Sequence, residues 1–128
     1  MAACHDRFMT KSSDSPVRIA VVGSGPAGVY ACEALLDWAD SVGREIVVDL
    51  LDSLPVPFGL LRHGVAPDHP RIKGIARTLQ EIGADPRIRF LGNVEFGRDL
   101  SLDDARRLYH AVLFSTGVHT VFGVPRRL

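Results

Sequence analysis

The chain has 128 residues, of which 46% are hydrophobic and 23% are charged. These proportions are typical of one ordinary globular domain and differ from those of disordered, fibrous and membrane proteins. Fifteen basic and fifteen acidic side chains give a formal net charge of zero. This balance argues against a nucleic-acid binder that relies on bulk electrostatics.

The cysteines and the first residues of the chain bear on its location. Cys4 and Cys32 have no CxxC spacing, so we expect neither a disulfide framework nor a metal site. Residues 1–16 are rich in Ser and Asp and lack an apolar segment, unlike a secretory signal or an acid-poor transit peptide. We expect a flexible lead-in over residues 1–16, one domain over residues 17–128 and a cytoplasmic location.

The segment after this lead-in predicts a strand, a turn and a helix. Val17–Val22 is a short apolar, β-branched run that ends in glycines, as a parallel strand buried on both faces does. A helix then runs from the glycines to a stop near Gly43. Its spacing places five residues on one face, which we expect to pack inward: Tyr30, Ala31, Ala34, Leu35 and Trp38.

A second strand completes a βαβ unit. Ile46–Leu51 is apolar except for Asp49, and it closes with Asp52. Strand, turn, helix and strand in this order predict an α/β fold with a Rossmann-like parallel sheet.

A proline-rich loop and a helix follow. The prolines and glycines of residues 53–70 disfavour continuous helix or sheet, while the apolar residues among them argue against disorder. The next apolar residues have helical spacing, with Asp68 as a candidate cap: Ile72, Ile75, Ala76, Leu79 and Ile82.

The last third of the chain predicts three strands and a helix. Ile88–Leu91 is a third strand, residues 94–96 are a short further strand, and Ala111–Phe114 is a final strand that ends in Ser-Thr-Gly. Ser101 resembles the start of a capping box. The helix that it opens is expected to turn three residues inward: Leu102, Ala105 and Leu108.

The turn after the first strand has the spacing of a dinucleotide-binding fingerprint, GxGxxG. Gly23 allows the tight turn, Gly25 lets the backbone approach a pyrophosphate, and Gly28 lets the helix pack against the strand. The helix start adds free N–H groups and the positive end of its dipole. Asp52 ends the second strand, roughly 20 residues further on, where an acid accepts hydrogen bonds from ribose hydroxyls. This context predicts dinucleotide binding, with a strand-end cap as the alternative role of Asp52.

From Arg18 to about Pro125, the chain resembles the adrenodoxin reductase family, which includes bacterial ferredoxin-NADP reductases of the same type. The specific part is the proline-rich loop, with PVPFGLLR at residues 55–62 and GVAPDHP at residues 64–70. GNV at residues 92–94 and YHAVL at residues 109–113 support the resemblance. Many enzymes share the glycine fingerprint, whereas they do not share the GVAPDHP run.

The resemblance implies FAD as the bound dinucleotide, in a glutathione-reductase-like domain, and NADP(H) as the co-substrate of the complete enzyme. It adds three cofactor contacts: Ala27 beside the pyrophosphate, Leu60 from the proline-rich loop, and Phe96. Two positions depart from the family, since Asp52 stands where the family has Glu and Phe96 where it has Val. The shorter Asp52 predicts longer hydrogen bonds to the ribose, and Phe96 either stacks on the cofactor or crowds it.

The resemblance also assigns two motifs near the flavin. His69 falls where the family has a histidine close to the flavin ring and the incoming nicotinamide, in a positioning role because the flavin itself accepts the hydride. The alternative is that His69 fixes the loop at a helix start. Ser115, Thr116 and Gly117 resemble a small-residue motif that brings a later strand close to the cofactor, with a plain strand-to-loop turn as the alternative.

Members of this family are several times longer and continue into an NADP-binding domain. We therefore expect this chain to be the incomplete FAD-binding part of a reductase that passes electrons from NADPH through FAD to a ferredoxin-like iron-sulfur protein. By itself it is expected to be inactive. The alternative is a non-catalytic nucleotide-binding remnant or an interaction module. A small NAD-dependent dehydrogenase is disfavoured because no Tyr-xxx-Lys pair follows.

Overall fold

The computed structural model describes residues 15–57 and 70–117, and the side chains of all of these except 70–73. Four parallel strands form one sheet in the order β3-β2-β1-β4. The strands are β1 (Val17–Val22), β2 (Ile46–Leu51), β3 (Ile88–Leu91) and β4 (Ala111–Phe114). The α/β, Rossmann-like parallel sheet expected from the sequence is therefore confirmed. The proposed lead-in falls almost wholly outside the described residues.

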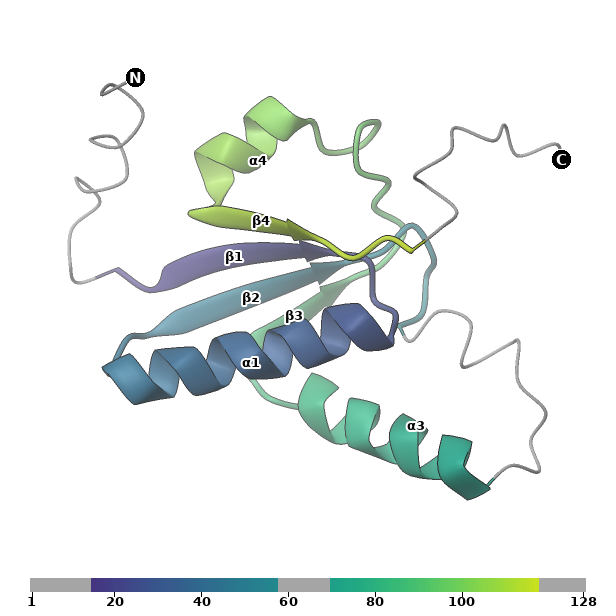
Figure 1. Ribbon diagram of the computed structural model, residues 1–128. Helices are drawn as coiled ribbons and strands as arrows, with labels where there is room; N and C mark the ends of the chain where they lie inside the picture. The colour runs from purple at the N-terminus through teal and green to yellow at the C-terminus, as the bar shows by residue number, and fades with distance from the viewer. Residues whose placement is uncertain (1–14, 58–69, 118–128) are drawn as a thin grey trace, which may run out of the picture.

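Within the described ranges, three helices cover the two faces of the sheet (Figure 1). α1 (Pro26–Val42) and α3 (Pro70–Gly83) pack side by side on one face, and α4 (Leu102–Leu108) lies on the other. Helices on both faces explain why the strands are nearly continuous apolar runs. None of the helices in the described ranges is long and apolar enough to cross a membrane.

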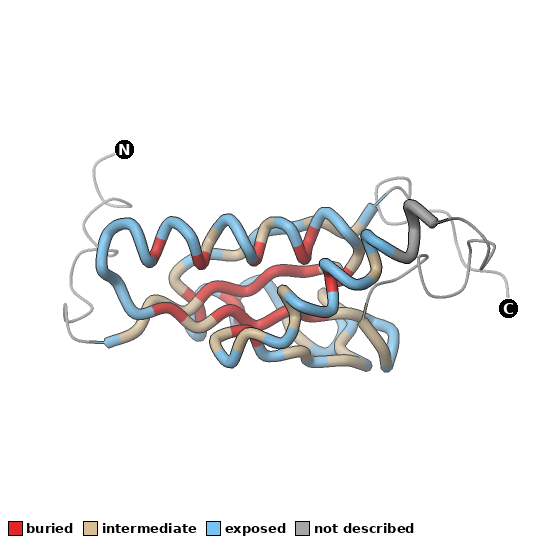
Figure 2. The backbone as a smooth tube through the Cα atoms, turned by 90° about the horizontal axis from the view of Figure 1, so that it is seen from below, coloured by how far each residue is buried: buried red, intermediate tan, exposed pale blue. Residues whose placement is uncertain are grey.

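The inward face expected for α1 is confirmed only in part, since Leu35 is partly buried against the core whereas three of the five expected residues are exposed. Tyr30 and Trp38 are 41% and 46% exposed, and Ala34 is exposed as well. Figure 2 shows buried positions only along the side of α1 that faces the sheet. The buried residues are Gly28, Val29, Cys32, Leu36 and Ala39. Both sets satisfy helical periodicity, and the small Gly, Cys and Ala side chains let the helix approach the strands closely.

The predictions for the other helices hold in part. In α3, Leu79 is fully buried against the α1 side of the core, whereas Ile75 is 39% exposed. Ser101 does cap α4, because its hydroxyl accepts a hydrogen bond from the Asp104 N–H. Of the three residues expected to face inward from α4, only Ala105 is buried, while Leu102 and Leu108 are exposed.

The short strand expected at residues 94–96 is also wrong. Within this segment only Phe96 forms a bridge, to Leu100. Asn93 has a positive φ of 57°, and Gly97 has a φ of 95°, so the backbone turns where an extended strand would have to continue. The segment leaves the sheet, and its residues Val94 and Phe96 pack against the core on the α4 face.

Asp49, the polar exception in the second strand, is the centre of a buried network. Its carboxylate is 1% exposed and accepts hydrogen bonds from Arg89 Nε at 2.6 Å and from the Tyr109 hydroxyl at 2.8 Å. Arg18 from β1 lies 3.9 Å from the same carboxylate. Burial, together with the Asp49 carboxylate, raises the pKa of Tyr109 to about 12. Asp49 thus joins β1, β3 and the segment before β4 through one side chain.

Candidate nucleotide-binding site

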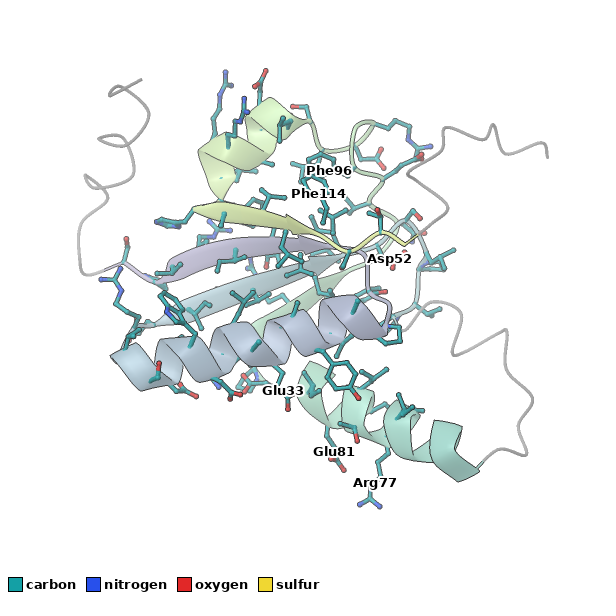
Figure 3. All side chains as sticks on the ribbon, viewed as in Figure 1. Glu33, Asp52, Arg77, Glu81, Phe96 and Phe114 are labelled. Atoms are coloured by element: carbon teal, nitrogen blue, oxygen red, sulfur yellow. The ribbon has the colours of Figure 1, made fainter. Side chains whose placement is uncertain are left out.

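Those predicted site residues that the structure describes lie near the carboxyl end of the sheet, where three strand ends meet. Val22, the last residue of β1, pairs with Leu51 of β2 and with Phe114 of β4. Figure 3 places Asp52 at this edge, beside the turn that leads into α1. In open α/β sheets, ligands bind in the crevice outside the carboxyl ends of the strands.

Gly23 makes the tight turn between β1 and α1. Its φ is 107°, and its N–H donates to the Leu51 carbonyl at 2.7 Å. A Cβ at this position would lie 2.5 Å from the carbonyl oxygen of Ser115. Both the dihedral angle and the close approach of β4 therefore require glycine here.

Gly28 lets the first turn of α1 sit directly on this turn. A Cβ at Gly28 would overlap the carbonyl oxygen of Gly23 and come within 2.8 Å of the Ser115 hydroxyl. The space between helix and strand is thus already filled by backbone atoms.

Gly25 differs from these two glycines. It is the N-cap of α1, with φ −68° and ψ 179°, an extended conformation open to any residue. A Cβ at Gly25 would meet no atom of the described residues within 4 Å. Neither backbone strain nor packing against these residues requires glycine at this position, and the space beside it is open to a ligand. The neighbouring Ala27 is exposed, and the first turn of a helix has N–H groups that lack intrahelical partners.

Asp52 is partly exposed, and both oxygens of its carboxylate accept hydrogen bonds. Its Oδ2 accepts the Ser24 N–H at 2.8 Å and the Ser24 hydroxyl at 2.5 Å, and its Oδ1 accepts the Leu54 N–H at 3.0 Å. The carboxylate therefore does act as a strand-end cap. A carboxylate offers about four acceptor sites, so one site on Oδ1 stays available to a ligand hydroxyl.

Two serines support this site through contacts that the sequence analysis did not predict. Ser24 is fully buried, although it occupies one of the variable positions of GxGxxG. The Ser115 hydroxyl donates to the Gly23 carbonyl at 3.0 Å and ties β4 to the glycine turn. A polar residue inside a glycine motif and a serine at a strand end were the only sequence signals for either role.

The segment 92–94 holds the end of β2 in place. The Val94 N–H donates to the Asp52 carbonyl at 2.9 Å, and the Asn93 N–H donates to the Leu54 carbonyl at 3.2 Å. A Cβ at Gly92 would lie 2.9 Å from the same Leu54 oxygen. This contact explains why a glycine follows β3.

Phe96 and Phe114 form an aromatic pair on the α4 side of the same edge (Figure 3). Their ring centroids are 4.9 Å apart and their planes stand at 89°. Phe96 packs against the buried cluster that includes Val22 and Leu51, while Phe114 is 53% exposed. The sequence did not single out Phe114.

Comparison with known proteins bears on what this edge binds. No family model matches the chain. The mitochondrial NADPH:adrenodoxin oxidoreductase of Drosophila melanogaster is 46% identical over 112 residues, which are 87% of this chain and 23% of that protein. NADPH-ferredoxin reductase FprA of Mycobacterium leprae is 43% identical over 103 residues, 80% of this chain and 23% of that protein. This chain is homologous to part of the adrenodoxin reductase family.

A solved structure agrees with this assignment. Mycobacterium tuberculosis FprA in complex with NADPH matches with a TM-score of 0.71 and 44% identity, over 78% of this chain and 22% of that chain. The chain thus spans about a quarter of the length of the adrenodoxin reductase relatives that it matches.

The residues that the adrenodoxin reductase resemblance adds are only partly placed. Ala27 is the second residue of α1, two positions after Gly25, and Phe96 lies on the α4 side of the edge. Thr116 and Gly117 follow β4, next to Ser115, and Gly117 has a φ of 71°. Leu60, His69 and the candidate cap Asp68 lie outside the described residues.

Proposed function

We propose that this chain binds FAD at the carboxyl end of its sheet, as the flavin-binding part of an NADPH-dependent reductase. In the complete protein, electrons pass from NADPH through FAD to a ferredoxin-like iron-sulfur protein. The names of the relatives, NADPH:adrenodoxin oxidoreductase and NADPH-ferredoxin reductase, support this reaction. The observation that carries FAD binding is the open space at Gly25, the N-cap of α1, where the missing Cβ leaves the first N–H groups of the helix accessible to a phosphate.

The residues around Gly25 suit the pyrophosphate and the adenosine ribose of a dinucleotide. Gly23, Gly25, Ala27 and Gly28 bring the start of α1 to the pyrophosphate, whose charge suits the N–H groups and the helix dipole. Asp52 accepts a ribose hydroxyl through its remaining site on Oδ1.

The contacts beyond the adenosine end also belong to the proposal. Leu60, Phe96, Thr116 and Gly117 line the cofactor, and His69 positions the nicotinamide against the flavin. When bound, FAD supplies the hydride acceptor and the single-electron donor, while the protein orients the reactants and excludes water.

The chain by itself is proposed to be inactive with NADPH. Close approach of nicotinamide and flavin supplies much of the rate of hydride transfer, and in this proposal the NADP-binding domain that holds the nicotinamide belongs to the complete reductase. The cytoplasmic location stays a prediction, because relatives of fly, plant and human are named mitochondrial.

FAD titration of the purified chain tests this proposal. We expect bound flavin absorbance and tighter binding of FAD than of FMN, which lacks the adenosine end. Asp52→Ala should weaken FAD binding by about 1–3 kcal/mol, the usual cost of stranding hydrogen-bonding partners. Equal affinity for FMN and FAD would contradict the proposed site. A folded chain that binds neither flavin would favour the non-catalytic remnant or interaction module.

A further inference from the structure

Ser24 makes an unusual pair of contacts for a variable position in a glycine-rich turn. Its side chain is fully buried, and its backbone N–H and its hydroxyl both donate to the same Asp52 oxygen, Oδ2. The hydroxyl contact, at 2.5 Å, is the shorter of the two. These two bonds use the acceptor capacity of Oδ2.

The two bonds to Oδ2 determine which oxygen of Asp52 can accept a ligand. Ser24 holds Oδ2, and among the described residues the Leu54 N–H, at 3.0 Å, is the sole donor to Oδ1. The free acceptor site of the carboxylate therefore lies on Oδ1. Rotation of the carboxylate would break both bonds to Ser24, so the hydroxyl limits the directions in which Asp52 can accept a ligand.

We propose that Ser24 is a positioning residue, which aims Asp52 so that Oδ1 accepts one hydroxyl of a nucleoside ribose. This inference rests on the proposed function and deepens it. The hydroxyl acts through Asp52 alone, whereas the backbone N–H of residue 24 supports the turn whatever side chain is present. Alanine at this position removes one oxygen from a buried site and leaves the N–H contact in place.

A double-mutant cycle on the 128-residue chain tests this role. Calorimetric FAD titrations of the wild type, Ser24→Ala, Asp52→Ala and the double variant give four dissociation constants. Loss of the equivalent of one ordinary hydrogen bond between Asp52 and the ribose predicts that Ser24→Ala weakens FAD binding about five- to tenfold in the wild-type background. In the Asp52→Ala background the same substitution should change the affinity by less than about twofold, because the group through which Ser24 acts is gone.

A matched control and a conservative variant sharpen the test. Ser41→Ala removes a hydroxyl that donates to the Trp38 carbonyl near the far end of α1, and it should leave FAD affinity unchanged. Ser24→Thr keeps the hydroxyl and should restore most of the affinity lost in Ser24→Ala. Thermal unfolding without ligand is measured for every variant, since a positioning role predicts little change for Ser24→Ala.

The outcomes separate this inference from the proposed function. Failure of the wild type to bind FAD would overturn both. Tight FAD binding by the wild type and by Ser24→Ala alike would overturn only the role of Ser24. The same loss in both backgrounds, or loss of the fold in Ser24→Ala, would show that the hydroxyl is structural and would overturn the inference as well.

Discussion

The face of the sheet under α1 and α3 has a wholly apolar core, whereas the face under α4 is organised around one buried carboxylate. The first core contains buried residues from β1, β2, β3, α1 and α3: Ile19, Val21, Val29, Cys32, Leu36, Ala39, Ile46, Val48, Leu50, Leu79 and Ile88. The second contains fewer: Ala20, Val22, Leu51, Ala105 and Tyr109. It leaves Leu102, Leu108 and Phe114 exposed.

This difference shows how one sheet uses two kinds of stabilisation. Apolar burial is non-directional and scales with area, so the α1 face gains stability from the number of its contacts. The α4 face has fewer buried apolar residues among those that the structure describes, and it adds directed contacts from Arg89, Tyr109 and Arg18 to Asp49. The carboxyl end of the sheet, where the candidate site lies, borders both faces. Val22 and Leu51 belong to the α4 face, and α1 starts from the glycine turn.

The largest expected effect is on the α1 face. Leu79→Ala removes a fully buried side chain and should lower the free energy of unfolding by about 2–5 kcal/mol in urea titrations. Ile75→Ala in the same helix is the control, because Ile75 is 39% exposed, and its cost should be clearly smaller. Similar losses for the two variants would mean that α3 is not packed as described.

The next effect concerns the buried carboxylate of the α4 face. Asp49→Asn keeps the shape of the side chain but removes the charge that Arg89 and Tyr109 contact. We expect a loss of about 1–3 kcal/mol, at the lower end because Arg89 is half exposed and water can solvate it. A variant as stable as the wild type would show that this face does not depend on Asp49, and the contrast between the faces would disappear.

The smallest effect is a pH dependence specific to the α4 face. The pKa of Tyr109 is raised from 10.0 to about 12 in the folded chain. Its contribution to stability is therefore complete below pH 10 and is lost as the pH rises from 10 to 12. Tyr109→Phe should remove this part of the alkaline loss of stability, measured by urea unfolding at several pH values.

Cys32 provides the comparison from the α1 face. Burial raises the pKa of its thiol from 9.0 to about 11, so its contribution starts to fall at a lower pH, near 9, and persists in Tyr109→Phe. If Tyr109→Phe and the wild type lost stability in parallel between pH 10 and 12, the hydroxyl of Tyr109 would not titrate against Asp49.

The sequence by itself determined where the strands lie and where the glycine turn between β1 and α1 begins. All four strands of the sheet have the predicted bounds, because each is a short apolar run ended by a charged residue, a glycine or a Ser-Thr-Gly turn. The Ser101 cap was also readable, since capping depends on residues only three positions apart. These features depend on residues that are close together in the sequence, so the sequence alone predicts them.

Only the tertiary structure decided which stripe of α1 is buried, because two stripes of the same helix satisfy the same period and the sheet selects one. It also decided the partners of the polar side chains. Ser24 meets Asp52 across 28 positions, and Asp49 meets Tyr109 across 60. Strand order and register bring these residues together. The periodicity of the sequence does not predict contacts between residues so far apart along the chain.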